Sequence, residues 1–102
     1  MRPTLRQMQY IVAVADTGRF RDAAELLNVS QPSLSEQISD AEAQLGVTLI
    51  ERSRTGAVIT PVGAEVVRRA RIILTQVEDM KTVARQSAGD VVGRYRLGTL
   101  PT

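Results

Sequence analysis

Five neighbouring side chains near the start of segment 30–46 have the chemistry needed to recognise the edges of nucleic-acid bases. Gln31, Ser33 and Ser35 can both donate and accept hydrogen bonds, as base edges do. Pro32 can touch a thymine methyl group, and Glu36 can accept a hydrogen bond from a cytosine amino group. The simpler interpretation is that Gln31 and Ser33 only cap a helix and that Glu36 is only solvated.

Basic residues flank this segment but do not occur within it. No Lys or Arg lies between Arg21 and Arg52, whereas residues 25–51 carry the acids Glu25, Glu36, Asp40, Glu42 and Glu51. Since the segment cannot neutralise phosphate, we expect it to read bases while flanking residues hold the DNA backbone or minor groove. The residues expected in that second role are Arg19, Arg21, Ser39, Arg52 and Arg54. For any single arginine, scattered solubilising charge is an equally good interpretation.

The composition offers few groups for catalysis. The chain has no Cys and no His, which excludes disulfides, Cys nucleophiles, Ser-His triads and the common zinc sites. Glu36 and Asp40 form an i, i+4 pair, but on an exposed helix such a pair is usually a solvated face. We expect no enzyme activity, no metal and no cofactor. With 43% hydrophobic residues and no apolar run near the ~18 residues of a membrane helix, a cytoplasmic globular protein without membrane contact is expected.

Three helices are expected to position these residues, with caps at their ends. The first begins after Thr4 and ends at Gly18, the second covers roughly 20–27, and the third runs from the cap Ser30 to Gly46. The short turn at 28–30 and the small Ala24 are typical of a helix-turn-helix. The third helix is expected to bury Leu34, Ile38, Ala41 and Leu45, so that its opposite face would enter the major groove.

A two-stranded wing and a long helix are expected next. The β-prone runs 49–51 and 58–60 flank a turn containing Gly56, which would place Arg52 and Arg54 at the tip of a hairpin. Thr60-Pro61 then begins a helix that runs to about Ser87. The expected fold class is therefore mainly α, a winged helix-turn-helix of three helices and a two-stranded β wing followed by a long dimerisation helix.

The long helix carries an apolar seam with the spacing of a coiled coil. Its members, 4 and 3 residues apart in turn, are Val66, Ala70, Ile73, Val77, Met80 and Ala84. A three-helix core is too short to cover this helix, so we expect a homodimer through it. The alternative is that the helix packs wholly on its own domain.

The expected organisation has three parts: a DNA-binding domain over 1–60, a linker and dimerisation helix over 61–88, and a hinge with a first strand over 89–102. The stretch AGDVVG contains two glycines, which suits a hinge. The stretch RYRLGTLPT alternates polar and apolar residues like a strand, without a partner elsewhere in the chain. We therefore expect a longer parent protein, with a disordered tail as the alternative.

The run FRDAAELLNVSQPSLSEQISDAEAQLGVTLIERSRTGAVITPVG resembles the N-terminal segment of LysR-type transcriptional regulators. The positions that carry the resemblance are Ala23-Ala24, Val29-Ser30-Gln31-Pro32, Ser35, Ile38, Glu42, Leu45-Gly46, Leu49, Arg52, Thr60 and Gly63. A weaker resemblance, in FRDAA, QPSLSEQI and GTLPT, is to the peroxide-responsive branch of that family. The sensing cysteines of that branch would lie in a domain beyond this chain.

The resemblance implies a winged helix-turn-helix, a linker helix that pairs two subunits and a small-molecule-sensing α/β domain absent here. It implies binding of double-stranded DNA at interrupted-dyad promoter sites as a dimer, or as a tetramer in the full-length protein. It also implies that Gln31, Pro32 and Ser35 face bases and that Arg52 or Arg54 lies at the wing.

Three positions depart from the family pattern: Glu36 is often basic there, Ala41 is usually larger, and Ile50 is commonly Phe. Two other functions stay open on the residues alone. One is a compact winged-helix protein that binds DNA without sequence preference. The other is a protein-interaction module built on the long helix, which predicts no DNA affinity.

Overall fold

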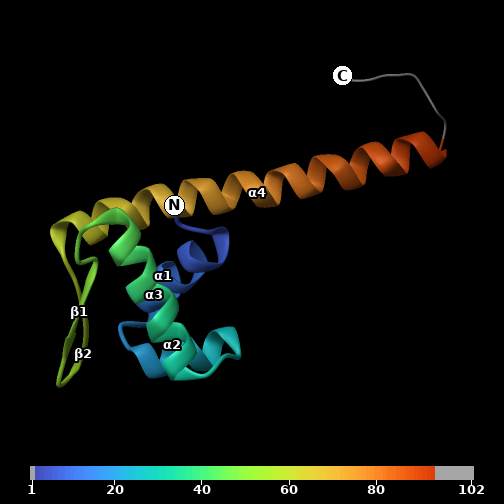
Figure 1. Cartoon of the computed structure of the whole chain (residues 1–102). Coiled ribbons are helices and arrows are strands. Elements are labelled where there is room, and N and C mark those ends of the chain that lie inside the picture. The colour runs from blue at the N-terminus through green and yellow to red at the C-terminus, as the bar shows by residue number, and fades with distance from the viewer. Residues whose placement is uncertain (1, 94–102) are drawn as a thin grey trace.

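The computed structural model describes residues 2–93, with side chains to residue 88, and has four helices and a small sheet (Figure 1). In chain order the elements are α1 (Leu5–Thr17), α2 (Phe20–Leu27), α3 (Gln31–Leu45), β1 (Ile50–Ser53), β2 (Gly56–Ile59) and α4 (Pro61–Gly93). This is the mainly α winged helix-turn-helix expected from the sequence, and the prediction of fold class is confirmed.

The predicted caps are confirmed because local hydrogen bonds fix them. Thr4 and Gln7 form a reciprocal capping box at the start of α1. Ser30 caps α3 by accepting a hydrogen bond from the Ser33 backbone N–H at 3.2 Å. Asn28 ends α2 with φ 58°, the left-handed conformation that Asn tolerates, and so allows the short turn into α3.

The core lies where α1 is packed by α2, α3 and α4. Its largest fully buried side chains are Ile11, Val14, Leu34 and Leu49. Leu45 was expected in this core, and that expectation was wrong, because it is 40% exposed. It is the last residue of α3, and the chain turns away at Gly46, so the next core contact comes from Leu49 instead.

The wing pairs β1 and β2 antiparallel, with Ile50 opposite Ile59 and Ser53 opposite Gly56. The hairpin connection is therefore residues 54–55. Arg54 lies at the tip as predicted, but Arg52 does not, because it pairs with Ala57 inside the ladder. Leu49 and Thr60, expected in the strands, lie just outside them and join the wing to the core and to α4.

The α4 helix crosses the domain and then continues past it without further support (Figure 1). At ~1.5 Å per residue its 33 residues span about 50 Å. The helix continues through the glycine-containing stretch 88–93, so the expected hinge is helical in these residues. A helical glycine costs only about 1 kcal/mol relative to Ala, which does not by itself end a helix. The predicted first strand, from residue 94 onward, lies outside the described residues.

Candidate nucleic-acid interface

The N-terminal turn of α3 presents its polar side chains outward. Gln31, Pro32, Ser33 and Glu36 are exposed, and Ser35 is half-buried. Since Ser30 supplies the cap, Ser33 contributes only its backbone N–H to capping, and its hydroxyl is not needed there. The residue that caps α3 is therefore Ser30, and not Gln31 or Ser33.

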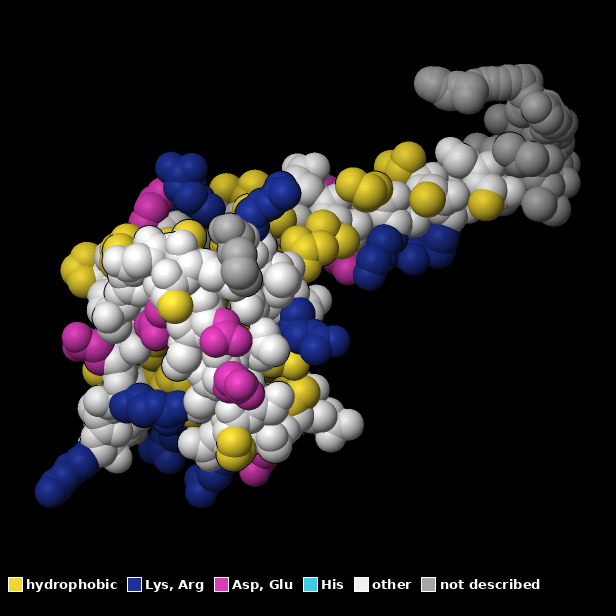
Figure 2. Space-filling view, in the orientation of Figure 1, with side chains coloured by type: hydrophobic (Ala, Val, Ile, Leu, Met, Phe, Trp, Pro, Cys, Tyr) yellow, Lys and Arg dark blue, Asp and Glu magenta, His cyan; other side chains and the backbone are white. Residues whose placement is uncertain are grey.

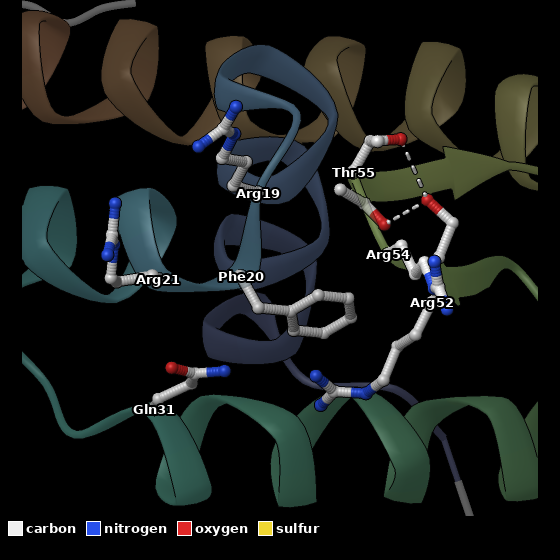
Figure 3. Close-up of a pocket in the computed structure, with 9 residues that line it drawn as sticks. Arg19, Phe20, Arg21, Gln31, Arg52, Arg54 and Thr55 are labelled. Atoms are coloured by element: carbon white, nitrogen blue, oxygen red, sulfur yellow. Dashed lines mark hydrogen bonds between the residues drawn. The ribbon is translucent and has the colours of Figure 1, made fainter.

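The four predicted arginines gather around one groove between the wing and the start of α2 (Figure 3). This groove has a volume of about 500 Å³. It is lined by Arg19 and Arg21 from the beginning of α2, by Gln31 from α3, and by Arg52 and Arg54 from the wing. Residues over 30 positions apart in sequence thus form a single basic surface beside the polar face of α3.

Ser39 does not line this groove, although it was predicted to share the role of these arginines. It is exposed farther along α3. In Figure 2, a group of basic side chains lies at the lower end of the domain, where the wing is. The basic groove and the polar face of α3 meet at Gln31, which lines the groove, while Glu36 and Asp40 are exposed farther along α3.

Arg52 makes two contacts that join the wing to both helices of the motif. Its guanidinium lies 3.8 Å from the centroid of the Phe20 ring, a cation–π arrangement (Figure 3). Its Nη2 also donates a hydrogen bond to the Ser35 hydroxyl oxygen. The sequence predicted only that residue 20 lies in a helix, and nothing in the local spacing of Phe20 indicated a contact with Arg52.

The wing is fastened to the domain at both ends. Near its tip, the Ala57 backbone N–H donates to the Gly18 carbonyl at 2.8 Å. At its base, the Glu42 carboxylate of α3 accepts from the backbone N–H groups of Leu49 and Ile50, at 2.7 and 3.1 Å. These bonds fix the wing relative to α3, so the arginine positions relative to the base-reading face are set by the fold.

The start of α4 has its own charged contacts, away from the groove. The hydrogen bonds of Arg68 and then Arg69 lower the pKa of the Glu65 carboxyl from 4.5 to about 2. Arg71 donates to Asp16 of α1 at 2.5 Å, and this bond raises the pKa of Arg71. The Arg71–Asp16 pair ties α4 to α1 next to the buried Ala70, just before the exposed part of the helix.

The expected dimer seam divides into two parts. Ala70 is 2% exposed and Val66 half-buried, because both pack on the chain's own domain. Ile73 is 39% and Met80 68% exposed, and Val77 is intermediate. Ala84 is exposed as well. The first two seam positions are therefore used within the subunit, and only the seam from Ile73 onward is open for a partner.

Residues 2–93 contain no helix that is both long and apolar enough to span a membrane. Nor does this part of the chain gather three or more acidic side chains in a way that could hold a metal ion. Among the described residues, the basic groove and the exposed face of α3 carry the side chains suited to nucleic acid.

Residues 5–64 match the sequence profile described as "Bacterial regulatory helix-turn-helix protein, lysR family". Among curated proteins, the HTH-type transcriptional regulator EstR of Acinetobacter baylyi is 38% identical over 100 residues, 98% of this chain and 33% of EstR. The DNA-binding transcriptional dual regulator OxyR of Escherichia coli is 39% identical over 98 residues, 96% of this chain and 32% of its own length. The chain thus spans about a third of the length of these relatives.

Solved structures give the same picture. The oxidized form of OxyR from Corynebacterium glutamicum aligns with a TM-score of 0.83 at 37% identity, covering 89% of this chain and 28% of that one. In two structures of DNA complexes, the match covers nearly the whole protein chain. The CbnR_DBD-DNA complex has a TM-score of 0.79 at 39% identity, covering 83% of this chain and 98% of that one. The BenM_DBD/catB site 1 DNA complex has a TM-score of 0.81 at 35% identity, covering 83% of this chain and 96% of that one.

Proposed function

We propose that this chain, which belongs to the lysR family of bacterial regulatory helix-turn-helix proteins, is the DNA-binding part of a sequence-specific transcription regulator. The family is one of transcription regulators and not of enzymes. The observation that carries the proposal is the joining of four arginines into one groove beside the exposed polar turn of α3. The DNA complexes of similar domains support double-stranded DNA as the partner.

In this proposal α3 enters the major groove and the arginines contact the backbone or minor groove. The exposed side chains of Gln31, Pro32, Ser33 and Glu36, together with Ser35, then face base edges. Arg54 at the wing tip and Arg19 and Arg21 at the start of α2 neutralise phosphates on either side. Ser39 belongs to the α3 face and not to the groove.

The exposed part of α4 supports pairing of two subunits. Four large apolar side chains are exposed along this helix: Ile72, Ile73, Met80 and Val83. Monomeric soluble proteins rarely expose a large contiguous apolar patch. We propose that two copies pair through this region, bind an interrupted dyad, and act in the cytoplasm. Tetramers and control by a small molecule would depend on a further domain of the parent protein.

The relatives do not point to one effector. EstR and OxyR are 38% and 39% identical to this chain, so its DNA-binding segment matches a peroxide-responsive branch no better than another regulator.

The test is selection of genomic DNA fragments by the purified chain, sequenced and repeated at two salt concentrations. We expect enrichment of an interrupted dyad that persists at higher salt, with affinity falling at a log-log slope of about −0.9 per neutralised phosphate. Binding without enrichment would favour a non-specific DNA-binding protein. No binding at either salt concentration would favour the protein-interaction module.

A further inference from the structure

Phe20 and Arg52 are brought together from the start of α2 and the first strand of the wing. The Arg52 guanidinium lies 3.8 Å from the Phe20 ring centroid and donates to Ser35 of α3. Phe20 itself is only 8% exposed and belongs to the core cluster, so its ring cannot move far. One wing arginine is therefore held by a rigid ring and by the helix that carries the base-reading side chains.

The arrangement leaves the useful part of the guanidinium free. A planar guanidinium binds an aromatic ring through its face, whereas its five N–H donors point outward in the plane. One of these donors is used by Ser35. The remaining donors can bind phosphate or a base edge without breaking either contact, and Arg52 lines the open groove where such a ligand would lie (Figure 3).

An arginine side chain that is mobile before binding loses rotamer entropy when it binds DNA. An arginine that is already ordered in the free protein does not incur this cost at binding. On the basis of the proposed function, we infer that Phe20 is a positioning residue for DNA recognition: its ring holds the Arg52 guanidinium in the binding orientation before DNA arrives. The hydrogen bond from Arg52 to Ser35 fixes the wing against the face of α3 proposed to read bases. The position of the Arg52 guanidinium therefore bears on sequence specificity as well as on affinity. Arg54, at the tip of the hairpin, is the matched wing arginine outside this contact.

The test is a double-mutant cycle of Phe20→Leu and Arg52→Lys in the purified chain, using the dyad fragment enriched in the selection experiment. Phe20→Leu keeps an apolar side chain, and Arg52→Lys keeps the charge but loses the planar group. We expect Phe20→Leu to weaken binding roughly three- to tenfold, the range of one cation–π contact. In the Arg52→Lys background the same change should weaken binding less, because an ammonium can attract the ring but has no planar face to stack on it.

Two matched variants separate positioning from a general loss of packing. Phe20→Tyr retains the aromatic ring and should therefore bind DNA with nearly wild-type affinity. Phe20→Leu combined with Arg54→Ala should give additive losses, since within the described residues the cation over the ring is Arg52 and not Arg54. In the DNA-free chain, the Arg52 Nε–H proton should show a ring-current shift in NMR that Phe20→Leu abolishes and Phe20→Tyr keeps.

The outcomes are distinct. Coupling in the Phe20–Arg52 cycle together with the ring-current shift supports the inference. Specific DNA binding with an additive Phe20–Arg52 cycle, or with no ring-current shift, overturns this inference and leaves the proposed function standing. Absence of DNA binding by the wild-type chain overturns the proposed function and this inference with it.

Discussion

The Glu42 carboxylate of α3 accepts a hydrogen bond from the backbone N–H of Leu49 at 2.7 Å, and the same oxygen accepts from Ile50 at 3.1 Å. Glu42→Ala leaves both donors without their acceptor at the base of the wing. We expect the free energy of unfolding to fall by about 1.5–3 kcal/mol, the usual range for hydrogen bonds to charged groups. Urea denaturation followed by circular dichroism measures the change.

Glu36→Ala is the matched control for Glu42→Ala, because Glu36 lies on the same helix but is exposed. It should change stability by no more than about 0.5 kcal/mol. Equal losses in the two variants would show that the Glu42 bonds do not hold the wing.

Gly63 lies in the first turn of α4, close against the wing base. A Cβ added there would overlap the Leu49 carbonyl oxygen, which is backbone and cannot move aside cheaply. We expect Gly63→Ala to destabilise the domain by about 1–3 kcal/mol, although Ala is favoured over Gly in a helix by about 1 kcal/mol. The melting temperature of the variant, compared with that of the wild type, shows whether the substitution destabilises the domain.

The neighbouring substitution Ala64→Gly makes the reverse change at an exposed position of the same turn. It should cost only about 1 kcal/mol, the ordinary difference in helix propensity. If Gly63→Ala instead stabilised the domain, the close approach of Gly63 to Leu49 would be refuted.

The helix ends were predictable from sequence because they depend on neighbouring residues. Thr4, Gly18 and Ser30 cap as expected, since each cap is a bond or conformation within a few positions along the chain. Leu45 was misplaced because periodicity gives a face of a helix but not where the core stops. Likewise, the glycines after residue 87 indicate only a local preference against helix, and α4 continues through them.

Of the candidate site, the four arginines of the groove were predictable from the sequence, whereas the part played by Phe20 and the contacts of Arg52 were not. The arginines were chosen from their flanking positions, and the groove brings four of them together. The contact of Arg52 with Phe20 spans 32 positions and that with Ser35 spans 17, and each depends on how the wing packs. The seam shows the same limit, because heptad spacing cannot tell that Ala70 is covered by its own domain.

Glu65 links the stability of the start of α4 to pH. Its pKa in the folded chain is lowered from 4.5 to about 2 by Arg68 and Arg69, so folding favours the charged carboxylate. The stabilisation is present above pH 4.5 and is lost as pH falls toward 2. We expect Glu65→Gln to lower the melting temperature slightly at pH 7 and not at pH 2, because the pair is exposed and weak.

Added salt should shrink the difference between wild type and Glu65→Gln at pH 7. The same comparison for Glu25→Gln, an exposed acid on α2, serves as a control. A Glu65→Gln effect that is as large at pH 2 as at pH 7 would mean that the ion pairs are not its source.

Glu36 and Arg54 are expected to contribute to DNA binding in different ways. Glu36→Ala should relax the preference at one base pair by about 1–3 kcal/mol with little loss of non-specific affinity, because it removes only a base-edge acceptor. Arg54→Ala should weaken binding on all sequences and reduce the salt slope by about 0.9. Fluorescence anisotropy on the enriched site, its single-base variants and unrelated DNA, over a salt series, measures both. Uniform affinity changes across sequences in Glu36→Ala would refute base reading by this residue.

Ala70 and Met80 share the apolar seam of α4 but lie in opposite environments, 2% and 68% exposed. Ala70→Asp puts a charge into the core of the subunit, so we expect it to unfold the domain. Met80→Asp puts the charge on a surface that only a partner would cover. It should leave the helical circular dichroism spectrum intact while shifting the chain from dimer to monomer in analytical ultracentrifugation and weakening binding to a dyad. Arg85→Asp, an exposed substitution nearby on α4, controls for the charge itself. A Met80→Asp dimer as tight as the wild type would place the subunit contact elsewhere, because a carboxylate buried in an apolar seam is strongly unfavourable.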